Sequence, residues 1–120
     1  MRIQTVLLFV KDLGRMTAFY RDVVGLRPIE ETCLEDWVEL DAGSVRLGLH
    51  RIPAHVAETI AIEDPPRYRE SSATKIIFQV ADVDVEANRL RSLDVPILVR
   101  PWGGREFVDP EGNVLGLQAT

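Results

Sequence analysis

The segment Thr5-Val6-Leu7-Leu8-Phe9-Val10-Lys11-Asp12 joins a short apolar run to a charged pair, and it is the most informative part of the chain. A β-strand is expected over Ile3 to Val10, because apolar and β-branched residues follow one another up to Lys11. Asp12 is a good helix N-cap, and it is followed at helical spacing by Leu13, Met16, Phe19, Tyr20 and Val23. Gly25 stands where a glycine commonly ends a helix. The chain therefore begins with a strand and a helix.

Three more strands are expected after this helix. They cover Leu26 to Leu34, Asp36 to Leu40 and Val45 to His50, with a turn at Asp41-Ala42-Gly43-Ser44 between the last two. The last strand alternates clearly, with Val45, Leu47 and Leu49 set against Arg46, Gly48 and His50.

The same order of elements returns in the second half of the chain. Strands are predicted over Lys75 to Val80, Pro96 to Val99, Arg105 to Val108 and Val114 to Gln118, with a helix capped by Asp82 and turns at Trp102-Gly103-Gly104 and at Asp109-Pro110-Glu111-Gly112-Asn113. Some residues also match at a spacing of 70: Val10 with Val80, Asp12 with Asp82, Arg21 with Arg91. At a spacing of 68, Leu47-Gly48-Leu49-His50 matches Leu115-Gly116-Leu117-Gln118. We interpret the chain as a duplicated βαβββ unit.

The length of 120 residues suits one domain, because two independent cores would each be too small. We expect a single domain over 1–120, made of module one (1–50), a linker (51–73) and module two (74–120). The linker holds three prolines and a short helix predicted over Ala54 to Ile62. Long connections of this kind often bind or cover ligands.

Composition excludes several classes of protein. Apolar residues make up 46% and charged residues 28%, which argues against a disordered, collagen-like or coiled-coil chain. The run from Val6 to Val10 is too short for a membrane span or a signal-peptide core, so we expect a cytoplasmic protein with no membrane partner. A net charge of −5 without a basic cluster argues against nucleic acid as a partner. Cys33, the single cysteine, excludes an intrachain disulfide and a cysteine-rich zinc site.

The two ends of the chain resemble the vicinal oxygen chelate superfamily, which includes glyoxalase I, the bleomycin resistance proteins, fosfomycin-modifying enzymes and extradiol dioxygenases. The resemblance rests on residues 5–13, on Ala18-Phe19-Tyr20-Arg21-Asp22-Val23-Val24-Gly25-Leu26 and on Phe107-Val108-Asp109-Pro110-Glu111-Gly112-Asn113-Val114-Leu115. It implies an α+β fold of two tandem βαβββ modules, whose curved mixed sheets form a cup-shaped cavity with the helices on the convex face. It leaves the function open, because the superfamily mixes enzymes with binding proteins.

Family enzymes hold a divalent metal with a His or Gln on the first strand and a Glu or His on the last strand of each module. The matching positions here are Thr5, Gly48, Lys75 and Gly116. Threonine is a weak ligand, glycine has no side chain and a lysine ammonium repels a cation. We therefore expect no metal at this position and no cofactor.

Strand alternation predicts which side chains face the cup. The candidate ligand-binding residues are Thr5, Phe9, Trp37, Glu39, His50, Lys75, Trp102, Phe107 and Gln118. Aromatic and charged groups are mixed on this face, which favours a ligand cavity over a dry core. No catalytic residue is assigned.

Four functions are compatible with this pattern. The first is a metal-independent small-molecule binding protein, similar to the bleomycin resistance type, that sequesters a flat or aromatic polar ligand. The second is a lyase, isomerase or hydrolase that uses His50, Lys75 or Glu39 in place of a metal. The third is a metal-dependent glyoxalase or dioxygenase, and the fourth is a module whose cup is filled by a partner protein. Open sheet edges predict a homodimer.

Overall fold

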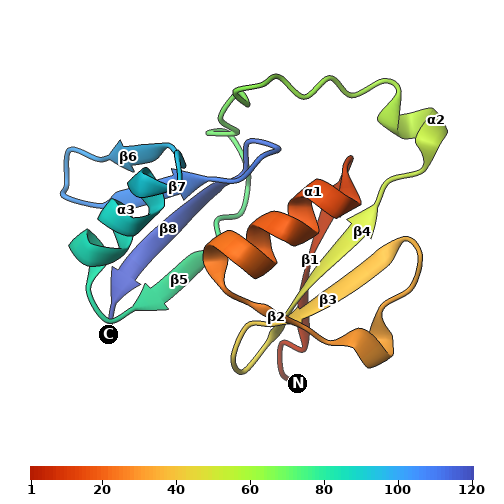
Figure 1. The fold of residues 1–120 in the computed structure, drawn as a ribbon, viewed down its shortest axis with the longest axis horizontal. Helices are drawn as coiled ribbons and strands as arrows, with labels where there is room; N and C mark the ends of the chain where they lie inside the picture. Colours follow the sequence, from red (N-terminus) through yellow and green to blue (C-terminus); the bar gives the residue numbers. More distant parts are fainter. The chain divides into compact units, whose positions relative to one another are not determined.

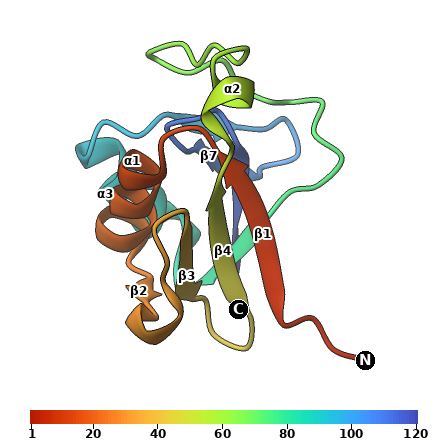
Figure 2. The same ribbon diagram turned by 90° about the vertical axis from the view of Figure 1, so that its right-hand side faces the viewer.

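The strand β1 (Thr5–Val10) opens the first of two compact units, Met1–Ala61 and Ile62–Thr120. The computed structural model describes every residue from Met1 to Thr120. In the first unit, β1 is followed by the α-helix α1 (Leu13–Ala18), the π-helix η1 (Phe19–Val24), β2 (Arg27–Pro28), the 3-10 helix η2 (Glu30–Thr32), β3 (Trp37–Asp41), β4 (Arg46–Arg51) and α2 (Ala54–Ala57). Its four strands form a mixed sheet in the order β1-β4-β3-β2, with β1 at one edge (Figures 1 and 2).

The first helix begins where the sequence predicted, because the Asp12 carboxylate accepts a hydrogen bond from the Arg15 backbone N–H at 3.0 Å. It changes to a π-helix at Phe19 and ends at Gly25, whose φ of 93° is readily adopted only by glycine. Its buried residues include Met16 and Tyr20, both fully buried. The helix contacts β3 and β4, which contribute Leu40 and Leu49 to the same core.

The second predicted strand, Leu26 to Leu34, is wrong over most of its length. Only Arg27 and Pro28 form a strand beside β3, and the chain then turns into η2. Beyond them, the Ile29 N–H donates to the Glu39 carbonyl and Leu34 forms an isolated bridge with Trp37. Pro28 has no N–H to donate to a sheet ladder, which confines it to an edge. The Thr32 hydroxyl donates to the Ile29 carbonyl at 3.0 Å and stabilises the turn instead.

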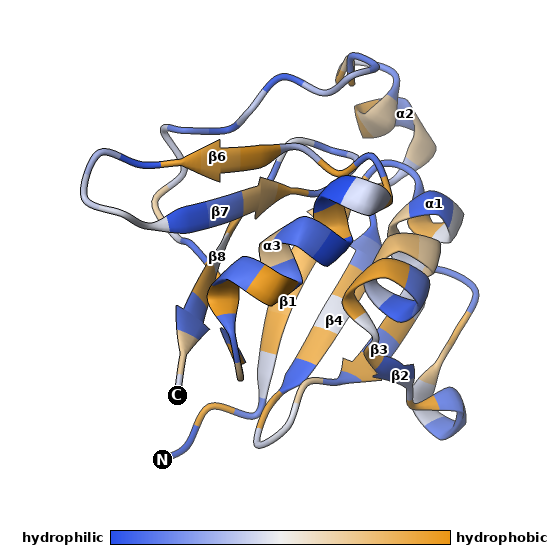
Figure 3. Cartoon of the chain, turned by 60° about the vertical axis from the view of Figure 1, so that its left-hand side comes forward, coloured by the Kyte–Doolittle hydropathy of each residue, from blue (hydrophilic) through white to orange (hydrophobic).

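The second unit repeats the architecture of the first. It contains β5 (Ile77–Val80), α3 (Val83–Ser92), β6 (Ile97–Val99), β7 (Arg105–Val108) and β8 (Val114–Ala119), with the sheet order β5-β8-β7-β6. The Asp82 carboxylate caps α3 by accepting from the Val85 N–H at 3.0 Å, as Asp12 does in the first unit. Hydrophobic and hydrophilic patches alternate along α3 (Figure 3), and its buried residues are Ala87 and Leu90. The predicted fold class and the tandem βαβββ modules are confirmed.

The segment between the two sheets contains less helix than predicted. Only Ala54–Ala57 is α-helical, and Thr59 and Ile60 continue through turn-like bonds to Val56 and Ala57. The boundary between the units, at Ala61 and Ile62, falls inside the predicted linker. Further along, the Arg69 N–H donates to the Gly112 carbonyl at 2.8 Å, so this part of the linker is fastened to the β7–β8 turn. No helix in the structure has the length and apolar character of a membrane span.

Candidate functional site

Three aromatic side chains lie together on one face of the first sheet. The register pairs Phe9 with His50 across β1 and β4, and Trp37 with His50 across β3 and β4. The His50 ring centroid is 5.7 Å from that of Phe9 and 5.4 Å from that of Trp37, within the range of aromatic contact. We call Phe9, Trp37 and His50 the aromatic cluster. Phe9 remains 62% exposed, which is unusual for a large apolar ring.

A buried carboxylate lies beside this cluster. Glu39 is 8% exposed, and its two oxygens accept from Trp37 Nε1 at 3.0 Å and from Arg46 Nη1 at 3.2 Å. The hydrogen bond from Trp37 lowers the pKa of Glu39; burial opposes that effect, and Arg46 adds to it. The carboxylate therefore stays ionised at neutral pH and holds the Trp37 indole in place.

His50 also has an acidic neighbour. Its Nε2 lies 3.7 Å from Asp36 Oδ2, and the histidine side chain is 34% exposed. A protonated His50 would form an ion pair with Asp36, and a neutral one could accept or donate a proton at a bound ligand. The imidazole is thus the group of this face that can both pair with a carboxylate and exchange a proton with a ligand.

The remaining predicted residue of this face is Thr5, the first residue of β1. It pairs with Arg46, and Leu7 pairs with Gly48. A Cβ added at Gly48 would come within 2.9 Å of Leu7 Cδ1 and 3.2 Å of Thr5 Cγ2. The space above Gly48 is therefore occupied by side chains of β1, which is consistent with Thr5 and Leu7 sharing the face of Phe9.

The second unit has a network of charged side chains around a buried glutamate. Lys75 Nζ donates to Glu106, which is 6% exposed and also accepts from Arg100 Nε. Arg100 Nη2 in turn donates to Glu70 at 2.6 Å. Burial raises the pKa of Glu106, but the hydrogen bonds from Lys75 and Arg100 outweigh it, so the net shift is downward. Lys75, Glu106, Arg100 and Glu70 form what we call the charged network.

Phe107 does not lie on the face that the sequence analysis gave it. The β7–β8 register pairs Glu106 with Gly116 and Phe107 with Leu115, so Glu106 takes the expected position. Phe107 is 2% exposed and its ring lies 6.0 Å from that of Phe78, in the core on the other side of the sheet. The reason is the turn length, because five residues separate Val108 from Val114 whereas four separate Asp41 from Arg46. The extra residue inverts the alternation.

The other two candidates of the second unit lie apart from the charged network. Trp102 is 74% exposed at the tip of the β6–β7 turn, where its indole lies against Gly104. Gln118 is exposed and pairs with Gln79. It borders an open hollow of about 370 Å³ that Ile77, Gln79, Ala119 and Thr120 also line.

Sequence reasoning missed Glu106, Arg100 and Glu70. A signal for Glu106 was present, because Glu39 lies opposite Gly48 just as Glu106 lies opposite Gly116. Counting the longer Asp109–Asn113 turn would have aligned the two glutamates. Nothing in the sequence pattern points to Glu70, since it comes from the linker.

The residues at the family's metal positions do not fit a metal. Thr5, Gly48, Lys75 and Gly116 offer one weak hydroxyl donor and one cation, and the Lys75 ammonium is bound by Glu106. The structure contains no group of three or more His, Cys, Asp or Glu side chains arranged to hold a metal ion. The side chains at these four positions therefore lack the donors that a divalent cation requires.

Comparison with known families agrees with this fold. The profile of the Glyoxalase/Bleomycin resistance protein/Dioxygenase superfamily matches residues 2–117, so the chain belongs to this superfamily. No curated protein sequence matches the chain significantly.

Solved structures of several bacterial proteins are similar along almost the whole chain. A lactoylglutathione lyase from Agrobacterium tumefaciens is 27% identical, with a TM-score of 0.68 and coverage of 98% of this chain and 92% of the relative. TnmS3, an antibiotic-binding protein from Streptomyces sp. CB03234, is 22% identical, with a TM-score of 0.70 and coverage of 99% and 95%. A glyoxalase/bleomycin resistance protein/dioxygenase family enzyme from Burkholderia phytofirmans PsJN is 20% identical, with a TM-score of 0.72 and coverage of 97% and 96%. The last two show the fold alone.

Proposed function

We propose that this protein binds and sequesters a small, flat or aromatic molecule that carries a polar or charged group, and that it does so without a metal. The observation that carries the proposal is the aromatic cluster. Phe9 is 62% exposed beside His50 and Trp37, although burial of such a ring is strongly favourable. A planar ligand would cover these rings and gain both apolar contact and stacking.

The polar groups around the cluster support specific recognition. Trp37 is fixed by its bond to Glu39, so the indole is oriented before a ligand arrives. His50 supplies a group that can donate or accept a hydrogen bond. In the second unit, the Lys75 ammonium is already paired with Glu106, so an anionic ligand that bound Lys75 would share it with that carboxylate.

The absence of metal ligands at Thr5, Gly48, Lys75 and Gly116 favours binding over the metal-dependent chemistry of the superfamily. We expect protein dialysed against a metal-containing buffer to hold far less than one Zn, Fe, Mn or Ni per chain by elemental analysis. A stoichiometry near one metal per chain would contradict the proposal.

A second function, a metal-independent lyase or isomerase, is favoured by one observation. His50 lies 3.7 Å from Asp36, an arrangement in which an acid can orient a histidine that moves a proton. The lactoylglutathione lyase at 27% identity makes such chemistry worth testing. Product formed from a bound compound, lost in His50→Gln, would support this function, and tight binding without turnover would support sequestration.

The ligand can be sought with the two tryptophans, because the chain has only Trp37 and Trp102. We would first examine freshly purified protein by native mass spectrometry, which reports a retained ligand, a metal and the oligomeric state together. Aromatic compounds would then be screened by fluorescence against Trp102→Phe, in which Trp37 is the sole tryptophan, and against Trp37→Phe as the matched control. A response in the first variant and its loss in the second is expected. A screen in which Trp37 never responds would count against the proposal.

A further inference from the structure

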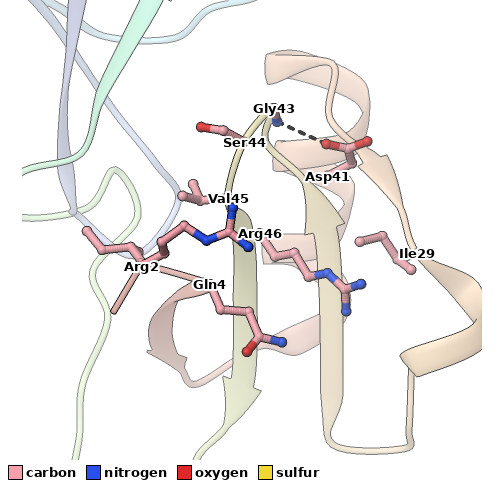
Figure 4. Close-up of a pocket in the computed structure, with 9 residues that line it drawn as sticks. Arg2, Gln4, Ile29, Asp41, Gly43, Ser44, Val45 and Arg46 are labelled. Atoms are coloured by element: carbon pink, nitrogen blue, oxygen red, sulfur yellow. Dashed lines mark hydrogen bonds between the residues drawn. The ribbon is translucent and has the colours of Figure 1, made fainter.

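A large hollow of the first unit has none of the aromatic cluster in its lining. It has a volume of about 930 Å³ and lies at the end of the sheet where β1 and β4 begin (Figure 4). It is lined by Arg2, Ile3, Gln4, Ile29, Asp41, Gly43, Ser44, Val45 and Arg46. Its size is in the range of small-molecule sites rather than of a single ion.

One of the two arginines that line this hollow has no acidic partner. Arg2 and Arg46 contribute two guanidinium groups, and the only acid is Asp41, whose Oδ1 already accepts from the Gly43 N–H at 2.9 Å. One N–H of Arg46 donates to Glu39, while the Arg2 guanidinium has no ion pair or hydrogen bond. The Gln4 amide and the Ser44 hydroxyl add donors without partners of their own. The guanidinium groups and the unpartnered hydrogen-bond donors thus line the same hollow.

The second unit offers an internal comparison. At the matching end of its sheet, Thr74 and Val114 correspond to Gln4 and Arg46, and the cavity there is only about 30 Å³. Its cations are neutralised within the protein, since Lys75 is bound by Glu106 and Arg100 by Glu106 and Glu70. Both of these cations of the second unit therefore have carboxylate partners. In the first unit Glu39 pairs with Arg46, and of the two arginines of the hollow Arg2 alone has no carboxylate partner.

We propose that the hollow around Arg2 and Arg46 binds an oxyanion, either a phosphate ester or a carboxylate, that is attached to a larger organic body. The planar guanidinium fork matches the oxygens of such groups, and it forms shorter and stronger hydrogen bonds than neutral donors do. Ile29 and Val45 supply apolar contact for the rest of the molecule. The ligand oxyanion supplies the partner that Arg2 lacks and that the cations of the second unit find in Glu106 and Glu70.

This inference goes beyond the proposed function and can fail independently of it. Inorganic phosphate has no ring, so its binding tests the hollow without the aromatic cluster. Conversely, a response of Trp37 to an aromatic compound says nothing about Arg2.

The test is an NMR titration of the ¹⁵N-labelled full chain with sodium phosphate, phenyl phosphate and sodium acetate, each against sodium chloride at equal ionic strength. We expect saturable shifts at the backbone amides of Gly43, Ser44 and Val45, with tighter binding of phenyl phosphate than of phosphate. Binding of phosphate but not acetate would identify a phosphoryl site, and the reverse a carboxylate site. Shifts no larger than those produced by chloride in all three titrations would overturn the proposal.

Variants that change the net charge equally distinguish binding at this hollow from nonspecific attraction of anions to the protein. Arg2→Gln and Arg46→Gln should each weaken binding about tenfold, the loss expected for one charged hydrogen bond. Arg21→Gln changes the net charge equally at an exposed arginine that pairs only with Asp22, and it should change affinity less than about twofold. Arg2 is exposed and unpaired, so Arg2→Gln remains informative even if Arg46→Gln disturbs folding through Glu39. Equal losses in Arg2→Gln and Arg21→Gln would overturn the proposal.

Discussion

Glu39 and Glu106 are equivalent residues of the two units, each buried and each opposite a glycine of the last strand. The partners differ, because Glu39 is held by a tryptophan and an arginine, and Glu106 by a lysine and an arginine. Burying a carboxylate is costly unless all its bonds are made, so each glutamate requires its partners to stay in place. A single duplicated residue thus organises an aromatic face in one unit and a charged face in the other.

At Trp37, truncation should remove the main contact surface for a flat ligand. We expect Trp37→Ala to weaken binding by about 2 kcal/mol or more, which is roughly thirtyfold in Kd. The affinity would be measured by isothermal titration calorimetry with a compound from the fluorescence screen. Trp102→Ala is the matched control, since that indole lies on a turn tip, and it should bind within about twofold of the parent protein. Equal losses in the two variants would contradict the assignment of Trp37 as the anchor.

The ionised state of Glu39 predicts a dependence of stability on pH. Its folded-state pKa is lowered below the ordinary value of 4.5, chiefly by the bond from Trp37. The stabilisation is therefore complete above the unfolded-state pKa and is lost as the pH falls through the folded-state pKa. Urea unfolding between about pH 6 and 3 should show a smaller loss of unfolding free energy in Glu39→Gln than in the parent. Glu58→Gln, which alters an exposed carboxylate, should follow the parent, and parallel profiles for all three proteins would contradict this prediction.

Among the elements, the turn between β7 and β8 is held by several hydrogen bonds. The fully buried Asp109 accepts from the N–H groups of Glu111 and Asn113 at 3.0 Å each, and from the Asn113 amide at 2.7 Å. Gly112 has a φ of +89°, and its carbonyl accepts the Arg69 N–H of the linker. The turn therefore fixes both the register of the hairpin and the path of the chain that leads into the second unit.

This arrangement predicts different costs for two glycine substitutions. A Cβ at Gly112 would lie 2.1 Å from the Arg67 carbonyl oxygen, whereas one at Gly43 would meet nothing within 4 Å. Both residues have positive φ, so Gly43→Ala measures the backbone strain alone, of order 1–2 kcal/mol. We expect Gly112→Ala to lower the unfolding free energy by at least about 1 kcal/mol more, because the Arg67 segment must move. Chemical denaturation would measure both, and equal losses would show that the linker is not held there.

Short-range signals in the sequence predicted most elements, and tertiary context explains the failures. Asp12 and Asp82 cap their helices because an N-cap acts within three residues. The shared face of Phe9, Trp37 and His50 followed from simple alternation and is matched by the register. Phe107 was placed on the wrong face because one extra turn residue inverts the alternation beyond it. The partners of Glu106 are Lys75, just before β5, and Arg100, just after β6, and no local pattern indicates such pairing.

On the scale of the whole molecule, each of the two sheets has one short and one longer edge strand. The edge strands β2 and β6 are short, and prolines limit both, since Pro28 lies within β2 and Pro96 precedes β6. The opposite edge strands, β1 and β5, are longer and each pairs with one strand of its own sheet. The carbonyl of Gln4, just before β1, accepts from the Arg46 N–H, and that of Val10 accepts from the Ile52 N–H. Alternation therefore directs the backbone groups of Leu7 away from β4. These unpaired groups are available to a second strand.

We therefore predict a homodimer that uses the free edge of β1. Light scattering at micromolar concentration should give a particle of twice the 13.5 kDa chain mass, since an exposed edge invites strand pairing and two-fold dimers are the commonest homo-oligomers. Leu7→Pro removes an outward N–H without breaking a bond to β4, and it should shift the mass toward the monomer. Leu7→Ala shortens the same side chain but keeps the N–H, so it should remain dimeric. A parent protein of 13.5 kDa would contradict the dimer itself, and a dimeric Leu7→Pro would place the interface away from β1.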